Sequence, residues 1–222
     1  MSTDIERSVA EMEAAGMTRA GAAPNELRDL AVTTARSLEG IELFGALETL
    51  SLIGCSVGDY SPLSELQSLR VLEIRNSDLV ETGWVTDLRL QVAVLRRNRV
   101  RDGRPVVGLP TLQVLDLSGN PLDHRTREAA VAVAEASNRV LTLDDEDTAE
   151  LNVLLADAGT GIVSYRVGEV LWACATGLDL VPHPEAGHVM TTPKEVLDVA
   201  RGSISPGRFL GLDASDEAGG GR

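Results

Sequence analysis

The stretch VGDYSPLSELQSLRVLEI, residues 57–74, decides the fold because the spacing of its apolar residues changes partway along. Steps of three residues are followed by one step of two, in the order Leu63, Leu66, Leu69, Leu72 and Ile74. A two-residue step places side chains on one face of a β-strand, whereas three-residue steps suit short turns of 3₁₀-helix. The stretch therefore predicts a coil that combines a short strand with a tight helical return.

The same pattern, LxxLxLxxN, recurs along the chain at a nearly constant interval. In-phase copies begin at Leu47, Leu69, Leu90 and Leu112, which are 22, 21 and 22 residues apart. A weaker copy begins at Leu27, and RVLTLDD at residues 139–145 is predicted to be a degenerate sixth strand after the helical stretch TREAAVAVAEAS. A period of this length predicts stacked coils, because one coil cannot bury its own leucines without neighbours.

These repeats, together with the D-x-S-P-L turn that begins at Asp59, resemble the leucine-rich repeat family and its internalin-type subclass. The resemblance covers about half of the chain, from Leu27 to Asp145. It implies an α/β fold, a short solenoid whose parallel strands line a concave face. The pattern has departures: Ala93 replaces a leucine, and Cys55 and Ser77 stand where Asn98 and Asn120 carry the usual amide. We expect all of these side chains to be structural, because buried backbone groups at the strand ends need partners.

The repeat divides the chain into four predicted parts. They are an N-terminal cap helix and linker (1–24), the solenoid (25–146), a C-terminal α+β cap or domain (147–202) and a disordered tail (203–222). Ile5, Val9 and Met12 recur at helical spacing and predict a first helix over residues 4–15. The end of the tail, SDEAGGGR, lacks apolar residues, which is typical of disorder.

The C-terminal part has no repeat and is predicted to contain both helices and strands. A helix is expected to begin at Asp147 or Thr148 and to stop at Gly159. The final helix has Thr192 as its cap and a glutamate three residues later. Between these helices, β-rich runs predict strands at residues 162–167, 169–175 and 178–181.

Composition and charge limit the classes of partner. The net charge of −14 argues against general attraction to nucleic acids or anionic membranes, which carry the same sign. The N-terminus lacks the features of a secretory signal, and the two cysteines form neither a disulfide framework nor a zinc-type pair. We therefore expect a cytoplasmic protein without cofactors. Lys194 is the only lysine beside many arginines, which points to a GC-rich bacterial genome.

The strand register predicts which side chains lie on the concave face, because outward residues alternate with buried leucines. Three valines are expected to stack in one column beside charged residues, an arrangement that suits a protein partner. The predicted partner-binding residues are Val71, Glu73, Arg75, Val92, Val94, Arg96, Val114 and Asp116. The alternative is an ordinary surface, since valine favours strands and arginine is commonly solvated.

Five arginines gather in RRNRVRDGR, residues 96–104, and raise the alternative of RNA or phosphate binding. The repeat phase sends Arg96 and Arg97 toward the concave face, whereas Arg99, Arg101 and Arg104 follow on the turn and the return. No aromatic residues interleave for base stacking. Pairing with acidic residues of neighbouring repeats is therefore the favoured interpretation.

The segment HPEAGH, residues 183–188, is the remaining stretch with possible chemistry. Its histidines and glutamate, His183, Glu185 and His188, could hold a metal or move protons. The histidines are five residues apart with Pro184 between them, which does not match the metalloprotease spacing. The favoured hypothesis is a non-enzymatic protein-interaction module of adaptor, scaffold or toxin-neutralising type. The alternative is a hydrolase or transferase site near His183 and His188, with the solenoid giving specificity.

Overall fold

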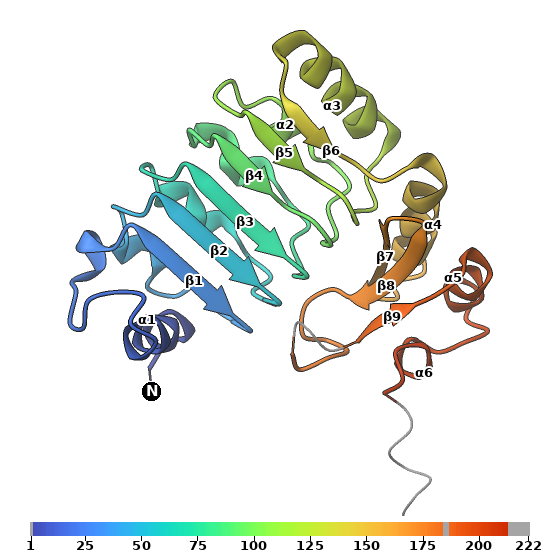
Figure 1. The fold of residues 1–222 in the computed structure, drawn as a ribbon, viewed down its shortest axis with the longest axis horizontal. Coiled ribbons are helices and arrows are strands. Elements are labelled where there is room, and N and C mark those ends of the chain that lie inside the picture. The colour runs from blue at the N-terminus through green and yellow to red at the C-terminus, as the bar shows by residue number, and fades with distance from the viewer. Residues whose placement is uncertain (1, 184–186, 213–222) are drawn as a thin grey trace, which may run out of the picture.

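The computed structural model describes residues 2–183 and 187–212, which form a mixed α/β structure with two sheets (Figure 1). The first sheet is parallel and six-stranded, with its strands in chain order. Its strands are β1 (Asp29–Thr33), β2 (Thr49–Ile53), β3 (Val71–Arg75), β4 (Val92–Val94), β5 (Val114–Asp116) and β6 (Val140–Thr142). Within the described residues, no helix is long and apolar enough to span a membrane.

The register of the parallel sheet aligns the leucines of successive repeats. Leu50 pairs with Leu72, which pairs with Ala93, which in turn pairs with Leu115. All four side chains are buried in one hydrophobic cluster. The adjacent parallel strands predicted from the repeat are therefore confirmed. Neighbouring repeats contribute side chains to one common hydrophobic core.

The return segments use short helices, as the three-residue steps predicted. They are η2 (Ile41–Leu43), η3 (Ser61–Glu65), η4 (Gly83–Asp87) and the short helix α2 (Arg104–Val107). Each turns one or two apolar side chains inward, for example Leu63 in η3 and Val85 in η4. Pro62 lies in the first turn of η3, where its missing N–H costs no hydrogen bond.

Asparagine side chains join neighbouring coils at the ends of the strands. The Asn98 Nδ2 atom donates to the Ile74 carbonyl at 2.8 Å and to the Leu95 carbonyl at 2.9 Å. The Asn98 Oδ1 atom accepts from the backbone N–H of Ser77 at 3.1 Å. Where the asparagine is replaced, the hydroxyl of Ser77 accepts from the backbone N–H of Cys55 at 2.9 Å. These bonds confirm the structural role predicted for this column of residues.

The N-terminal helix α1 (Asp4–Ala14) packs on β1 and buries Ile5 and Met12 in the same cluster as the leucines. Thr3 and Glu6 form a reciprocal capping box at its start. The helix ends one residue before the predicted range. Its first residue, Asp4, also accepts the backbone N–H of Arg36 at 2.7 Å, which attaches the helix to the first coil.

The second sheet is antiparallel and lies in the C-terminal part of the chain, with helices on one side. Its strands are β7 (Ile162–Val167), β8 (Val170–Ala175) and β9 (His188–Met190), and the helices of this part are α4 (Glu146–Asp157), α5 (Pro193–Ala200) and α6 (Pro206–Phe209). Helix α3 (His124–Ser137) packs instead on α2 and β6 of the parallel part. Helix α4 begins earlier than predicted, because Asp145 accepts the backbone N–H of Thr148 and acts as the cap. Helix α6 and the buried Leu210 fall in the range predicted as tail, while residues 213–222 lie outside the described residues.

The third strand predicted at residues 178–181 is wrong. These residues form a turn, and β9 pairs with β8 in their place. Gly177 adopts a φ of +72°, which turns the chain out of the sheet, and the backbone N–H of Leu178 then donates to the Ser56 hydroxyl at 2.6 Å. The apolar residues Leu178 and Val181 are buried in this turn rather than in a strand.

The antiparallel sheet lies beside the carboxyl ends of the parallel strands (Figure 1). Backbone and side-chain hydrogen bonds join the two: the Gly177 N–H donates to the Asn76 carbonyl at 2.8 Å, and the Arg99 Nε donates to the Thr176 hydroxyl at 2.7 Å. A separate apolar cluster beneath β7–β9 contains Leu155, Ile162 and Val196. The C-terminal elements therefore have their own core and are attached to the repeats by these polar contacts. The contact region, which includes Ser56, Asn76 and Arg99 on one side and residues 176–179 on the other, is here called the seam.

We expect Gly177→Ala to weaken this attachment more than Gly168→Ala does. Both glycines have positive φ, so each substitution should cost about 1 kcal/mol of backbone strain. A Cβ at position 177 lies 2.4 Å from the Ser56 Oγ atom, whereas a Cβ at position 168 meets no atom within 4 Å. The free energies of unfolding, measured in urea, should differ by about 2 kcal/mol or more between the variants. Equal losses of stability in the two variants would contradict the close approach of position 177 to Ser56.

Candidate functional site

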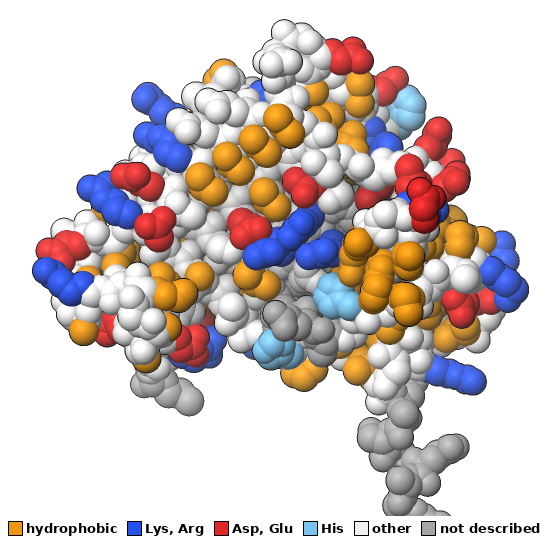
Figure 2. All heavy atoms as spheres, viewed as in Figure 1, with side chains coloured by type: hydrophobic (Ala, Val, Ile, Leu, Met, Phe, Trp, Pro, Cys, Tyr) orange, Lys and Arg blue, Asp and Glu red, His pale blue; other side chains and the backbone are white. Residues whose placement is uncertain are grey.

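The outward side chains of the parallel strands form the surface on which the partner-binding residues were predicted. This surface is here called the open face. A continuous column of valines crosses it, because Val71 pairs with Val92 and Val92 pairs with Val114. The register extends the column to Val140 in β6, whose side chain is 61% exposed. Figure 2 shows an oblique row of apolar side chains over these strands. Val140 was missed from the sequence because helix α3 lengthens the interval before β6.

A second column on the open face carries the acidic side chains. Glu73 pairs with Val94, and Val94 pairs with Asp116. The Ser51 hydroxyl donates to Glu73 Oε2 at 2.9 Å, and the Arg75 Nε lies 2.8 Å from Glu73 Oε1. Asp116 Oδ1 accepts from the backbone N–H and hydroxyl of the nearby Ser118 at 2.9 Å and 2.6 Å. Both carboxylates are therefore already engaged within the protein.

Arg96 completes the predicted set and lies just past the end of β4. Its Nε atom is buried and has no hydrogen-bond partner among the described residues. All eight predicted residues are partly exposed and lie on one face, so the structure brings the whole set together.

Arg97, which the predicted set omitted, is held rigidly at the boundary between the two sheets. It adopts a φ of +57°, and its guanidinium carbon lies 4.9 Å from the centre of the Tyr165 ring. The Arg97 Nε donates to the Asn76 Oδ1 at 2.8 Å. Burial lowers the pKa of Arg97. Stacking on the ring and the bond to Asn76 together fix the direction of the guanidinium.

His188 lies in the same cluster, and its tautomer follows from its neighbours. Asn76 uses its Oδ1 to accept from Arg97, so the opposite end of the amide is the NH₂ group. This group lies 3.0 Å from His188 Nε2, which therefore accepts. The His188 Nδ1 then carries the proton and donates to the Tyr165 hydroxyl oxygen at 2.7 Å. The histidine therefore joins the two sheets through its contacts with Asn76 and Tyr165.

A cavity of about 330 Å³ opens where the open face meets β7, and is here called the corner cavity. Its lining includes Arg96, Arg97, Asp116, Asp144, Tyr165 and Val167. Arg166, at the same rim, pairs with Asp145 at 2.9 Å. Sequence reasoning had no signal for this cavity, because its two walls are more than forty residues apart in the chain and share no repeat.

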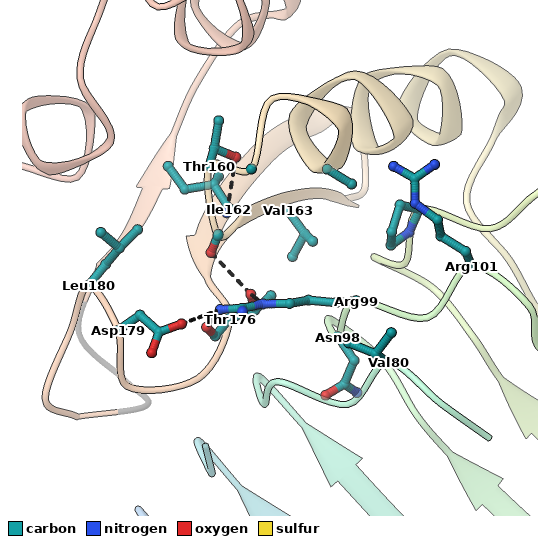
Figure 3. Close-up of a pocket in the computed structure, with 14 residues that line it drawn as sticks. Val80, Asn98, Arg99, Arg101, Thr160, Ile162, Val163, Thr176, Asp179 and Leu180 are labelled. Carbon is teal, nitrogen blue, oxygen red and sulfur yellow. Dashed lines mark hydrogen bonds and ion pairs between the residues drawn. The ribbon is translucent and has the colours of Figure 1, made fainter. Parts of the chain in front are cut away.

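Two of the remaining arginines of the run, Arg99 and Arg101, pair with C-terminal residues instead of neighbouring repeats. Arg99 reaches across the seam to Thr176 and forms an ion pair with Asp179 at 2.8 Å (Figure 3). Arg101 pairs with Asp157, and only Arg104 pairs within its own turn, with Asp102. The prediction of pairing between repeats is therefore wrong for Arg99 and Arg101. The cavity of about 380 Å³ around Arg99 is part of this seam.

The alternative catalytic site lacks a metal cluster within the described residues. Residues 2–183 and 187–212 contain no group of three His, Cys, Asp or Glu side chains placed to hold a metal ion. His183 is exposed, and Glu185 lies outside the described residues. Burial raises the pKa of the Cys55 thiol to about 11 and that of Cys174 to about 12, so both stay protonated near neutral pH.

Comparisons with known proteins give only distant likenesses. No protein-family model and no curated protein sequence matches the chain. Among solved structures, it is similar to an internalin C2 from Listeria monocytogenes strain 4b F2365, at 16% identity and a TM-score of 0.33, over 64% of this chain and 96% of that one. It is also similar to an internalin, inlF, from the same strain, with 16% identity, a TM-score of 0.33 and 69% of each chain covered. A likeness this weak carries no conclusion about what the chain binds.

Asp144 is the carboxyl group of the corner cavity with the most altered protonation. Its Oδ2 accepts the backbone N–H of Gly119 at 2.7 Å and lies 3.3 Å from the Asn152 amide nitrogen. Burial raises its pKa from the usual 3.8 to about 7, although the bond from Gly119 opposes the change. The folded protein therefore holds this proton at a pH where the unfolded chain has released it. The stabilising contribution is complete below pH 3.8 and is lost as the pH rises through 7.

We expect Asp144→Asn to gain stability relative to the native chain between pH 5 and pH 8. The amide keeps an acceptor for Gly119 but carries no charge that burial penalises. Because the side chain keeps some exposure, the relative gain in free energy of unfolding should be about 1–2 kcal/mol. Urea unfolding at both pH values measures it, with the exposed Asp87→Asn as control. Parallel pH profiles for the native chain and Asp144→Asn would contradict the assignment.

Proposed function

We propose that the protein is an interaction module that binds another protein on the open face of its parallel sheet. In this proposal, residues 25–146 form a leucine-rich repeat solenoid, residues 1–24 cap its first coil, and residues 147–202 form a C-terminal unit attached to its edge. The open face is the concave face of that solenoid. The partner-binding residues are the eight named from the sequence, with Val140 added.

The observation that carries the proposal is the valine column. Four neighbouring strands carry a valine at the same register position: Val71, Val92, Val114 and Val140. None of these valines belongs to the buried leucine cluster. A stacked apolar row with charged residues beside it has the composition of a protein-binding surface. Isolated exposed valines need no explanation, but a column that spans four strands offers one continuous apolar contact.

Rigidity of the open face also supports this role. Its backbone is fixed by the ladder of parallel strands, and its charged side chains Glu73, Arg75 and Asp116 are held by internal contacts. A surface that is already ordered loses little conformational entropy when a partner binds. The free, buried thiols of Cys55 and Cys174 fit a reducing compartment, so the proposed setting is the cytoplasm of a bacterium. An adaptor, a scaffold and a toxin-neutralising protein all fit this surface.

We expect Val92→Asp with Val114→Asp to reduce partner binding at least about tenfold, because two charges are placed in the centre of the apolar column. Affinity purification from cells that express the chain, with mass spectrometry of the bound proteins, identifies the partner. The affinity of native and variant chains for that partner is then measured by calorimetry.

Two further variants make the result specific. Val92→Thr with Val114→Thr keeps the β-branched shape and should weaken binding less, without loss of fold. Val131→Asp places a charge on the exposed side of α3, where the valine is 45% exposed, and should leave binding unchanged. If the aspartate pair retains the native affinity while remaining folded, the open face is not the binding surface.

A further inference from the structure

The antiparallel sheet has an apolar face that turns toward the open face of the parallel sheet. Strand alternation and register place Tyr165 opposite Trp172, Trp172 opposite Met190, and Val167 opposite Val170 on this side. Met190 is 70% exposed, Val167 61% and Val170 44%. This group of five side chains is here called the apolar wall. The opposite side of the sheet, with Leu171 and Ala173, is buried against α4 and α5.

The inner end of the apolar wall meets the arginines of the open face. Cys174 and His188, which lie on the same side of the sheet as the wall, contact Asn76 at the end of β3. Tyr165 stacks under Arg97, and Val167 lines the corner cavity together with Arg96. Figure 2 shows a large apolar patch directly beside a group of basic side chains. The open face and the apolar wall thus form two sides of one recess.

Two cations at this recess lack an ionic partner. Among the described residues, neither Arg96 nor Arg97 forms an ion pair, and the buried Arg96 Nε also lacks a hydrogen bond. They lie close enough to each other, and to Arg75, for mutual repulsion to lower the pKa of Arg97 after the larger effect of burial. Three acidic side chains, Asp116, Asp144 and Asp145, line the same cavity, but none of them forms an ion pair with either arginine.

The acidic side chains of the corner cavity are occupied by other groups. Asp116 accepts two bonds from Ser118, and Asp145 pairs with Arg166. Asp144 accepts the backbone N–H of Gly119 and is partly protonated near neutral pH. The two arginines therefore keep hydrogen-bond donors for a group that comes from outside.

We propose that this corner receives an acidic side chain of the partner protein, bound by Arg96 and Arg97, while a large apolar side chain next to it packs on the apolar wall. The inference rests on the proposed function and assigns one part of the partner's chemistry. A carboxylate matches the planar donors of two neighbouring guanidinium groups. A phosphate dianion fits less well, because it would carry twice the charge toward Asp116, Asp144 and Asp145.

The geometry is arranged before binding, which favours affinity. Asn76 and the Tyr165 ring hold Arg97, so little side-chain entropy remains to be lost when the carboxylate arrives. The Arg96 guanidinium, which forms no ion pair with a described residue, gains a charged partner through its outer nitrogens. Both effects increase the affinity for an acidic group at this position. The valine column, by contrast, offers only apolar contact.

A library of random peptides displayed on phage tests the proposal with a defined probe. The full chain is immobilised, and bound peptides are sequenced and synthesised. We expect enriched peptides to carry aspartate or glutamate beside a large apolar residue, and to bind Arg96→Gln with Arg97→Gln at least about tenfold more weakly than the native chain. Arg89→Gln with Arg125→Gln removes the same charge at exposed positions elsewhere and should leave the affinity unchanged.

A double-mutant cycle makes the test specific for the carboxylate. Replacing the acidic residue of the peptide by its amide should cost about tenfold with the native chain and much less with the double glutamine variant. Arg97 contacts Tyr165 of the antiparallel sheet, so its loss could disturb the fold at the seam. In that case the single variant Arg96→Gln is used for the test, because no hydrogen bond or ion pair of the described residues joins Arg96 to the antiparallel sheet. Val167→Thr with Met190→Gln should weaken the same peptides about tenfold by removing the wall.

The outcomes separate this inference from the proposed function. Peptides that depend on Val92 and Val114 but bind the glutamine variants at native affinity would overturn the corner assignment and leave partner binding on the open face intact. Absence of enriched peptides, or enrichment without acidic residues, would also overturn the corner assignment. The affinity of the Val92→Asp and Val114→Asp double variant for the partner tests the proposed function independently of the corner assignment.

Discussion

The structure depends on the parallel pairing of each coil with the next. A coil of about 22 residues has too few apolar side chains to form a core by itself, so Leu50, Leu72, Ala93 and Leu115 are buried only because the ladder places them in contact. The same ladder fixes the opposite side of each strand. Because side chains alternate, burying the leucines necessarily presents the valines and charged residues as an ordered outer surface. Core and open face are two results of one register.

The sequence predicted this part of the fold well because its information is local and repeated. Leu63 and Leu66 mark the return, Leu72 and Ile74 mark the strand, and the same spacing recurs in each copy. The eight candidate surface residues could be named for the same reason. Val140 escaped because α3 interrupts the period, although its register partner Val114 is in the predicted set.

The C-terminal part was predicted less completely because its key contacts are neither local nor repeated. The helices and the first two strands follow from capping residues and alternation, but the third strand depends on whether residues 178–181 or 188–190 reach β8. Gly177 decides this by turning the chain toward Ser56, a contact between residues more than a hundred positions apart. Likewise, nothing in the run of arginines indicated that Arg99 and Arg101 would pair with Asp179 and Asp157 rather than with other repeats.

Attachment of the antiparallel sheet also determines how an arginine beside the open face is held. Asn76 receives a bond from Arg97 on its side chain, donates toward His188, and accepts the Gly177 N–H with its carbonyl. One residue therefore links the direction of a surface arginine to the position of the second sheet. If the sheet separated, Arg97 would lose the Tyr165 ring and the histidine that orders Tyr165. A repeat surface without the C-terminal elements would keep the apolar column but lose the fixed cation beside it, so the proposed selectivity for an acidic partner group requires the joined molecule.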